Sequence, residues 1–596
     1  MQSIAGQLTA RLAEAVRCLG VESEASVHKS QDEKFGDYQW NGAMNLARQR
    51  GQKPREVAEA VIQHLQVSDL CETPEVAGPG FVNFRLKPAF LAESLTRVPS
   101  AGEPDADRLG LPNAAHPQRI VVDFSSPNLA KEMHVGHLRS TVIGECVARL
   151  LEFAGHDVIR ENHVGDWGTQ FGMLLAHLRH TRPDVADRPE ALEIHDLETF
   201  YVEAKARFDA DEDFKKEARD TVVALQQGDP ATRRIWKAFC DESLRHCRAV
   251  YDRLGVRLID RGESFYTDLI EEVIRRLEAM RMQRSDGFVA VSQGALCLFL
   301  KGFATREGEP LPMIVRKSDG GYNYATSDLA TILHRVEVLK ADRIVYVVGL
   351  PQKQHFEMLF AAARQAGWVS DRTTLIHLGF GSMLSATGTP FKTREGGTIK
   401  FKNLLDEAVA RARQVIESGG PEEGGRGRAT TPAEIAERVG LASVRYFDLC
   451  HSLQSDYRFD WDTMLSLEGN TAPYMLYAYA RIRSIGRKTG VDFARWRPTA
   501  AVVLEHPAEI ALGKKILQFA ETAEAAVVEL RPNLLTDYLY DLSKAFSRFY
   551  DKKLGVRVID ASPEGVRESR LRLCDLTGRT LCLGLNLLGI ETVEQM

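Results

Sequence analysis

The spacing of hydrophobic positions changes along the chain and divides it into three regions. Residues 4–19 and 54–65 carry apolar side chains at helical spacing. Residues 81–86 alternate apolar and polar positions as a strand with one exposed face does. A segment at 99–117 that is rich in Pro, Gly and Ala then predicts a linker. We therefore expect a separate α+β module at residues 1–108.

The middle region, residues 115–400, alternates buried strands with helices. Strands are predicted at Arg119–Phe124, Val158–His163, Arg343–Val348 and Leu375–Phe380. This alternation is typical of an α/β domain of the Rossmann type, which is built on a parallel sheet. Charged helices and a strand pair at 287–300 interrupt the pattern, so we interpret residues from about 185 to 300 as an insertion.

The rest of the chain is almost entirely helical. We expect residues 401–455 to form a junction, with a glycine-rich surface loop at 419–428. Helix-start signals follow at Thr431-Pro432 and Ser562-Pro563. Residues 456–596 are therefore predicted to form an all-α domain.

Composition indicates a soluble protein of several domains. The chain has 596 residues, of which 44% are hydrophobic and 27% charged. It has no apolar run long enough to span a bilayer and no signal peptide, so we expect a cytoplasmic protein with no membrane partner. Its nine cysteines are dispersed without a Cys-x-x-Cys pair, which argues against a disulfide framework and a structural zinc. The net charge of −6 neither predicts nor excludes nucleic-acid binding.

Residues 121–140 carry the clearest chemistry. They predict a buried strand, a polar loop and a helix that begins at His134-Val135-Gly136-His137. Phosphates bind at such a place, because free backbone N–H groups and the helix dipole favour negative charge. Lys131 adds a cation, and Gly136 lets a flat base lie close to the helix backbone. Two such histidines also suit a metal or a surface pair, but the preceding strand and Lys131 favour a phosphate site.

Several motifs in a fixed order resemble those of the class I aminoacyl-tRNA synthetases, and specifically of the arginyl-tRNA synthetase family. The segment His134–His137 is similar to the first class I signature. Five further matching segments follow it almost to the end of the chain, at residues 162–172, 322–329, 347–355, 460–474 and 585–591.

The second class I signature, which normally reads Lys-Met-Ser-Lys-Ser, is degenerate in this chain. Residues 388–397 read Gly-Thr-Pro-Phe-Lys-Thr-Arg-Glu-Gly-Gly. The resemblance implies that Lys131 compensates, because the transition state needs positive charge near the pyrophosphate and not a particular sequence position. Lys392 and Arg394 are the other candidates, and the sequence leaves the choice among the three open.

The resemblance implies a ligase that works in translation in two steps. L-arginine is activated by ATP to arginyl-adenylate, and the arginyl group then passes to the 3′ end of tRNA(Arg). His134, His137 and Lys131 would stabilise charge on the phosphate oxygens. Mg²⁺ is expected to arrive with ATP, held mainly by phosphates and waters, with no metal site of the protein's own and no bound zinc. The family also leads us to expect a monomer and an activation step that waits for tRNA.

Selection of arginine requires a group that recognises its guanidinium, and carboxylates do so best through paired charge-assisted hydrogen bonds. Asp328 lies four residues after Tyr324, so Tyr324 can pack along the arginine side chain while Asp328 binds the guanidinium. From the residues alone, a surface charge is the more ordinary interpretation of Asp328, and only the resemblance reverses it. The resemblance also implies substrate contacts from Asp123, Ser125, Asn128, His163 and Gln352. A purely structural role in a turn is an equal alternative for His163.

Two further groups are expected to bind tRNA. In the helical domain, Tyr474 and Arg481 combine an aromatic face with a cation, as unpaired bases require. Some tyrosines of that helix must instead be buried. In the N-terminal module, the resemblance assigns Phe81 and Asn83 to a base of the tRNA D-loop; without it, Phe81 would be a core strand residue.

Two other functions remain open at this point. A nucleotidylyltransferase also uses His-x-Gly-His after a strand, but it needs neither a helical C-terminal domain nor an N-terminal RNA module. A non-catalytic tRNA-binding relative has no use for the histidines of an ATP site. P-loop and protein-kinase motifs are absent, and so is the zinc-binding cysteine set of a cysteinyl enzyme.

An editing site is not expected, because a site built on charged hydrogen bonds rejects analogues. The insertion is therefore interpreted as a support for the tRNA acceptor end.

Overall fold

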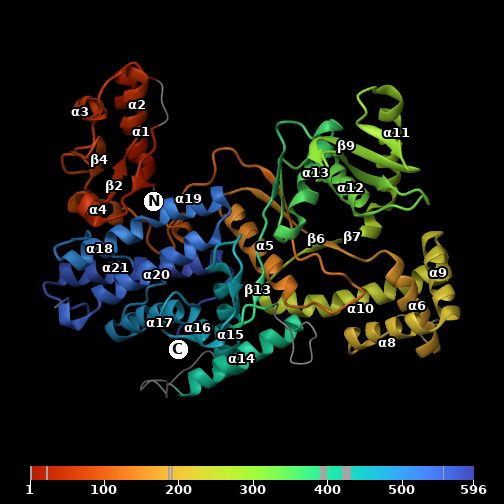
Figure 1. The fold of residues 1–596 in the computed structure, drawn as a ribbon. Helices are drawn as coiled ribbons and strands as arrows, with labels where there is room; N and C mark the ends of the chain where they lie inside the picture. The colour runs from red at the N-terminus through yellow and green to blue at the C-terminus, as the bar shows by residue number, and fades with distance from the viewer. Residues whose placement is uncertain are drawn as a thin grey trace. The chain divides into compact units, whose positions relative to one another are not determined.

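The computed structural model describes residues 3–21, 25–184, 188–189, 192–389, 399–418, 431–554 and 556–596. The chain divides into two compact units (Figure 1). One unit comprises Ala114–Gln414 and His451–Met464, and the other comprises Met1–Asn113, Val415–Cys450 and Leu465–Met596. Among the described residues, no helix has the length and apolar character needed to cross a membrane.

A five-stranded parallel sheet forms the centre of the first unit, in the order β12-β11-β5-β6-β7. Its strands are β5 (Arg119–Asp123), β6 (Asp157–Val164), β7 (Ile259–Gly262), β11 (Arg343–Tyr346) and β12 (Thr374–His377). The four strands predicted from the sequence are confirmed, and so is the α/β class. The central strand, β5, is apolar throughout its middle because both faces of a parallel sheet are covered.

Helix α5 (Gly136–Phe153) follows β5 and is buried along most of its length. Gly144 lets the helix approach the end of that strand, because a Cβ at this position would overlap the Phe124 ring. Two more helices, α12 (Tyr324–Glu337) and α13 (Lys353–Gln365), flank β11 in the chain. In the chain, the 3₁₀ turn η4 (Glu263–Tyr266) follows the end of β7, and the 3₁₀ turn η5 (Leu350–Gln352) follows the end of β11.

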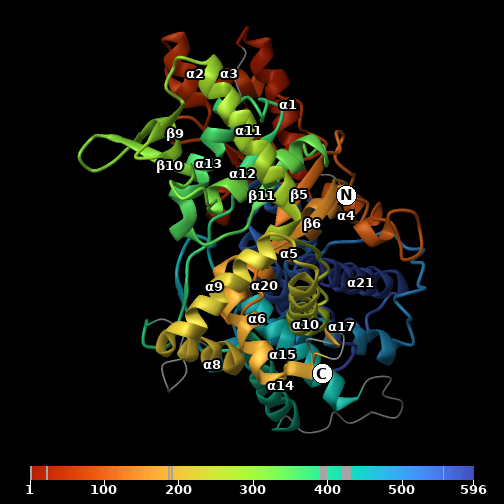
Figure 2. The same cartoon turned by 90° about the vertical axis from the view of Figure 1, so that its right-hand side faces the viewer.

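Two substructures are inserted into the sheet's connections. The first is a group of packed helices, α6 (Thr169–Thr181), α8 (Leu197–Ala210), α9 (Glu212–Gln226) and α10 (Pro230–Leu254). The second contains α11 (Thr267–Gln283) and the antiparallel strands β8 (Val289–Ser292), β9 (Ala295–Ala304) and β10 (Pro310–Arg316). Figure 2 shows β9 and β10 as a long hairpin. The predicted strand pair is β8 with β9, whereas β10 and the main-sheet strand β7 were not predicted.

The second unit contains the N-terminal module and the helical region. The module has α1 (Ile4–Cys18), α2 (Ala43–Arg50), α3 (Pro54–His64) and α4 (Pro88–Thr96) around the antiparallel sheet β1-β2-β4-β3. Its strands are β1 (His28–Lys29), β2 (Tyr38–Trp40), β3 (Glu75–Ala77) and β4 (Phe81–Phe84). The two helices and the strand predicted for this module are confirmed.

The predicted all-helical end is confirmed as well. Its helices are α15 (Pro432–Leu449), α17 (Ala472–Thr489), α18 (Pro507–Leu517), α19 (Phe519–Glu529), α20 (Pro532–Phe549) and α21 (Glu564–Leu587). Helix α14 (Phe401–Ser418) begins in the first unit, and α16 (Trp461–Leu465) lies at the end of the later segment that belongs to that unit. The strands β13 (Met383–Leu384) and β14 (Tyr457–Arg458), which pair with each other, also belong to the first unit.

Candidate active site

The chain makes a strained turn where it leaves β5. Ser125 and Ser126 adopt φ angles of 74° and 47°, which side chains other than glycine rarely adopt. Hydrogen bonds hold the turn: the Ser125 N–H donates to Ser140 Oγ at 2.9 Å, and the Ser126 N–H donates to Asn162 Oδ1 at 2.9 Å. Because Ser140 lies on α5 and Asn162 on β6, neighbouring elements impose this turn, which sends the chain toward the start of α5.

Ser125 itself is buried and fully engaged within the protein. Its hydroxyl lies 2.7 Å from the Tyr251 hydroxyl and accepts a hydrogen bond from Thr141 Oγ1 at 2.9 Å. These contacts suit a residue that holds the turn. The predicted substrate contact of Ser125 stays a prediction.

Asp123, at the end of β5, is bound by a buried guanidinium. Arg335, on α12, is fully buried and donates from Nη2 to Asp123 Oδ2 and from Nε to Glu161 Oε2, both at 2.7 Å. The Tyr346 ring centroid lies 5.0 Å from the Arg335 guanidinium carbon. Only 6% of Asp123 is exposed. In this structure Asp123 therefore joins β5 to α12. Its predicted contact with arginine stays a prediction.

The two signature histidines form a compact pair at the start of α5. The His134 Nδ1 accepts a hydrogen bond from the Gly136 N–H at 3.0 Å, and the His137 Nδ1 accepts one from the His134 N–H at 3.1 Å. Their ring centroids are 4.1 Å apart. A Cβ on residue 136 would lie 2.7 Å from the His134 ring, so glycine is needed here to admit that ring.

Both imidazoles are neutral near pH 7. Burial, and then the neighbouring His134, lower the pKa of His137 to about 3. Burial, and then the Lys131 ammonium, lower the pKa of His134. His134 Nδ1 accepts the Gly136 N–H, which places the single proton of that ring on Nε2. The His134 N–H favours the same tautomer of His137, whose Nδ1 also lies 3.3 Å from the His134 carbonyl. The pair thus offers two N–H donors at a helix N-terminus, where anions bind.

The segment that follows the degenerate second signature pairs with the first. The Val135 N–H donates to the Ile399 carbonyl at 3.0 Å, and the Phe401 N–H donates to the Met133 carbonyl at 3.0 Å. Between them, His134 and Lys400 form an antiparallel bridge. The predicted cations Lys392 and Arg394 lie outside the described residues. Lys131 is described, and its ammonium lies 4.3 Å from the Tyr201 ring centroid.

Asp328, the predicted guanidinium-binding residue (the guanidinium reader), lies on α12. His355, from α13, donates from Nε2 to Asp328 Oδ2 at 2.6 Å, which fixes the orientation of that carboxylate. Tyr324 begins α12 and is 75% exposed, so its ring is available to a ligand. Gln352, in η5 just beyond β11, is exposed too.

Two predicted polar residues lie at the carboxyl ends of β5 and β6. Asn128 is exposed, forms a parallel bridge with Gly165, and its Oδ1 accepts the Ala130 N–H at 3.0 Å. His163, near the end of β6, has a ring centroid 5.5 Å from that of Tyr266. Its Nδ1 is buried and has no hydrogen-bond partner among the described residues.

Glu263 is a candidate that the sequence did not reveal. It begins η4 directly after β7 and is partly buried. Burial raises its pKa to about 7, with further contributions from the Asp166 and Asp328 carboxylates. Asp166 is held by Ser264, whose N–H and Oγ donate to it at 2.9 and 2.5 Å. The site therefore concentrates negative charge at the end of the sheet, which favours a cationic ligand.

In the helical domain, two hollows flank α17. One, of about 240 Å³, is lined by Tyr477, Arg481, Lys488, Tyr550 and Met596 among others. The Arg481 guanidinium carbon lies 4.9 Å from the Tyr550 ring centroid. Predicted Tyr474 does not line it: its ring packs against that of Tyr540, with the centroids 5.7 Å apart. The exposed Tyr477 takes that place on the helix.

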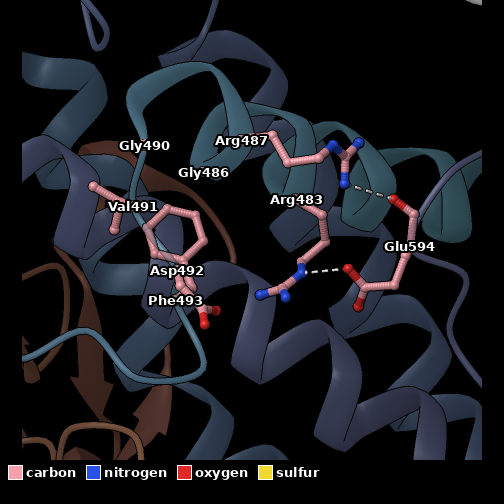
Figure 3. Close-up of a pocket in the computed structure, with 8 residues that line it drawn as sticks. All are labelled: Arg483, Gly486, Arg487, Gly490, Val491, Asp492, Phe493 and Glu594. Carbon is pink, nitrogen blue, oxygen red and sulfur yellow. Dashed lines mark hydrogen bonds and ion pairs between the residues drawn. The ribbon is translucent and has the colours of Figure 1, made fainter. Parts of the chain in front are cut away.

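The other hollow, of about 320 Å³, lies along the next face of α17 (Figure 3). Arg483 and Arg487 converge there on Glu594. Arg483 Nε donates to the Glu594 carboxylate at 2.8 Å, and Arg487 Nη1 donates to the Glu594 carbonyl at 3.2 Å. Because a carboxylate already binds Arg483, this hollow offers less free positive charge than the first.

The two residues predicted in the N-terminal module lie on β4. Asn83 is buried and its Oδ1 accepts a hydrogen bond from Gln39 Nε2 at 2.7 Å. Phe81 is partly exposed at the start of the strand. Of the two, Phe81 is the more accessible to a base.

Comparison with known proteins gives one result over the whole chain. The family model for the catalytic domain of "tRNA synthetases class I (R)" matches residues 105–461. The model for the DALR anticodon binding domain matches residues 475–596, and the model for the arginyl tRNA synthetase N terminal domain matches residues 2–86.

Individual relatives agree with these models. A Nostoc sp. protein named arginine–tRNA ligase is 51% identical over 564 residues, which cover 94% of each chain. A Rippkaea orientalis protein of the same name is 47% identical over 100% of each chain. Arginyl-tRNA synthetase structures from Plasmodium falciparum and Thermus thermophilus superpose over 100% of each chain, with TM-scores of 0.84 and 0.80 at 28% and 25% identity. With its sheet, its paired histidines and its helical domain, the chain belongs to the class I arginyl-tRNA synthetases.

Proposed function

We propose that this chain activates L-arginine with ATP and transfers it to the 3′ end of tRNA(Arg), using residues at the carboxyl edge of its parallel sheet. One juxtaposition supports this assignment above all. Neutral N–H donors at the start of α5 and carboxylates after β7 and on α12 belong to the same edge of one sheet. The donors suit phosphates and the carboxylates suit a guanidinium.

In the first step, an oxygen of the arginine carboxylate attacks the α-phosphorus of ATP, and pyrophosphate leaves. His134 and His137 would donate from Nε2 to phosphate oxygens without first taking up a proton. Lys131 would add a full positive charge beside them. Lys392 and Arg394 remain candidates for the same task near the pyrophosphate.

Magnesium is expected as part of the ATP complex. The groups at the start of α5 are hydrogen-bond donors and a cation, which suit phosphate oxygens and not a metal ion. Within the described ranges, no cluster of three or more His, Cys, Asp or Glu side chains could hold a metal. We propose that the phosphates and water supply most ligands of the magnesium ion.

On the amino-acid side, Asp328 would bind the guanidinium while His355 keeps its carboxylate oriented. Tyr324 would lie along the side chain of arginine. Glu263 would act as a second carboxylate, releasing its proton when the cation enters. Asn128 and Gln352, with Asp123 and His163, are proposed to hold the polar ends of the substrate.

In the second step, the terminal ribose hydroxyl of the tRNA attacks the arginyl-adenylate and AMP leaves. We assign tRNA contacts to Arg481 and Tyr474 in the helical domain, with Tyr477 beside Arg481 in the same hollow. Phe81 and Asn83 are the proposed contacts in the N-terminal module. Stacking on aromatic rings and positive charge are the usual means of holding unpaired bases.

Aminoacylation with an Asp328 variant tests the proposal. The wild type should charge tRNA with arginine in preference to lysine, cysteine and canavanine. Asp328→Ala should lower kcat/KM for arginine by at least about a hundredfold, because a charged hydrogen-bond partner is lost from a desolvated pair. Glu337→Gln, at the exposed end of the same helix, serves as the matched control.

If Asp328→Ala charged tRNA with arginine at the wild-type rate, another residue of the site would have to bind the guanidinium. Absence of charging by the wild type with every amino acid, despite ATP binding, would favour the nucleotidylyltransferase or the non-catalytic tRNA-binding function.

A further inference from the structure

The beginning of helix α8, in the insertion, makes two contacts near the first signature. The Lys131 ammonium lies 4.3 Å from the centroid of the Tyr201 ring. Lys400, which forms an isolated antiparallel bridge with His134, contacts Glu132 at 3.1 Å and Asp196 at 3.0 Å. Asp196 caps α8 and Tyr201 lies in its first turns, so one helix end contacts both Lys131, which precedes the first signature, and Lys400, which is bridged to His134.

The second contact links the start of α8 to the segment that pairs with the first signature. Asp196 caps the helix by accepting the Thr199 N–H at 3.0 Å. This backbone hydrogen bond, and then the Lys400 ammonium, lower the pKa of Asp196 to about 2, so the ion pair persists at any physiological pH. The ion pair links the start of α8 to Lys400, and the Tyr201 ring lies about one and a half turns further along the same helix, beside Lys131.

The chemical nature of the contact suits a cation that must stay charged. Within the part of the chain that the structure describes, no carboxylate forms an ion pair with Lys131. A carboxylate would neutralise the ammonium, whereas the face of an aromatic ring orients it and leaves its full charge for the phosphates. In this position the ammonium is close enough to His134 to help lower the pKa of that imidazole.

We propose that Tyr201 is a positioning residue for arginine activation: its ring holds the Lys131 ammonium beside His134 and thereby links the insertion to the ATP site. The inference rests on the proposed function of Lys131. It assigns to α8 a part in the first chemical step in addition to the expected support of the tRNA acceptor end.

Three single variants test it by arginine-dependent pyrophosphate exchange with tRNA present. Tyr201→Leu should raise the KM for ATP or lower kcat by about tenfold, as expected when a partly desolvated cation–π contact is lost. Tyr201→Phe keeps the ring and should behave as wild type. Phe208→Leu removes the ring that Lys205 approaches at 5.5 Å on the same helix, and should leave the rates unchanged. The KM for arginine and the Kd for tRNA should stay the same in all three.

A double-variant comparison separates this inference from the role of Lys131. Lys131→Met should lose activity, and Tyr201→Leu should add no further loss in the Lys131→Met background, because the ring then has no cation to hold. Independent, multiplying losses would overturn the inference, as would wild-type kinetics for Tyr201→Leu while Lys131→Met is impaired. Full activity of Lys131→Met would overturn the proposed function of Lys131 and the inference together.

Discussion

At the scale of single residues, burial and backbone hydrogen bonds set the protonation of the site. The signature histidines are neutral donors because each Nδ1 faces a backbone N–H and each ring is partly shielded from water. Glu263 is the opposite case, since burial and two neighbouring carboxylates make its ionised form costly in the empty site. Both effects arise from the immediate surroundings of each side chain, so each can be tested with one substitution.

Gly136→Ala tests the packing of the histidine pair. The added Cβ would lie 2.7 Å from the His134 ring, which must then move away from the start of α5. Displacement of a catalytic group by about 1 Å can cost about a hundredfold in rate, and we expect a loss of this order in kcat for pyrophosphate exchange. Thermal unfolding should change little, because residue 136 is exposed. Near-normal kcat in a folded Gly136→Ala protein would show that the His134 position is not critical.

The ionisation of Glu263 predicts a pH dependence of arginine binding. Below pH 7 the carboxyl holds a proton that the incoming guanidinium must displace, so the KM for arginine should rise by up to about tenfold per pH unit. Steady-state kinetics between about pH 6 and pH 8 measure this. Glu263→Gln should raise the KM at pH 8 and flatten its pH dependence. An unchanged slope in that variant would assign the titration to another group.

Glu263 also predicts a pH dependence of folding stability, which runs opposite to that of arginine binding. The pKa of Glu263 in the folded, empty protein is above its ordinary value, so the folded state holds a proton that the unfolded chain has released. The contribution of this group to stability is therefore fully present at low pH and is lost as the pH rises to 7. Bound arginine should cancel that loss.

At the scale of elements, one buried cation joins the strands and the helix that form the site. Arg335 of α12 binds Asp123 at the end of β5 and Glu161 of β6, and Arg261 of β7 completes the set with a 2.8 Å ion pair to Glu161. Because α12 also carries Asp328, this network holds the proposed guanidinium reader in register with the sheet. Buried charges of this kind are stable only while every partner is present.

Arg335→Ala should therefore destabilise the protein by about 3–5 kcal/mol, because two carboxylates remain buried without their partner. Chemical denaturation followed by circular dichroism measures the change. Arg276→Ala removes ion pairs to Glu272 and Glu337 at the surface and should cost no more than about 1 kcal/mol. Equal losses of unfolding free energy in the two variants would show that the buried network contributes no more to stability than the surface ion pairs do.

At the scale of the whole molecule, polar contacts dock the N-terminal module on the helical domain. The Tyr38 hydroxyl donates to Glu521 Oε2 at 2.9 Å, and Lys514 binds Asp37 at 2.6 Å. The linker is held as well, since Arg572 of α21 donates to the Val98 carbonyl at 2.6 Å. The two regions expected to contact tRNA therefore belong to one compact unit.

Tyr38→Phe tests this docking. Burial raises the pKa of Glu521, and loss of the tyrosine hydroxyl removes a donor that favours its ionised form. We expect a loss of about 1–3 kcal/mol near pH 7 that shrinks at low pH, where the carboxyl is protonated. Thermal unfolding at two pH values measures it, with Tyr540→Phe on α20 as the control. A loss that is the same at both pH values would point to packing and not to the hydrogen bond.

Much of the fold could be predicted because its signals are local. Apolar runs bounded by turn residues predicted β5, β6, β11 and β12, and helical spacing predicted α1 and α3. β7 was missed because Ile259–Gly262 is short, partly exposed and surrounded by charged helices. Glu263 was missed with it, since only its place after a strand of the main sheet distinguishes it from an ordinary surface carboxylate.

By itself, the sequence determined the order of the domains, the strand–loop–helix that carries the histidines, and the family, because spacing and motif order are properties of the chain alone. The tertiary structure decided which side chains meet. His355 reaches Asp328, Arg335 binds Asp123, and Tyr201 approaches Lys131 from positions 27, 212 and 70 residues apart in the chain. Burial also decided which carboxylate keeps its proton, because desolvation depends on what packs around a group and not on its neighbours in the sequence.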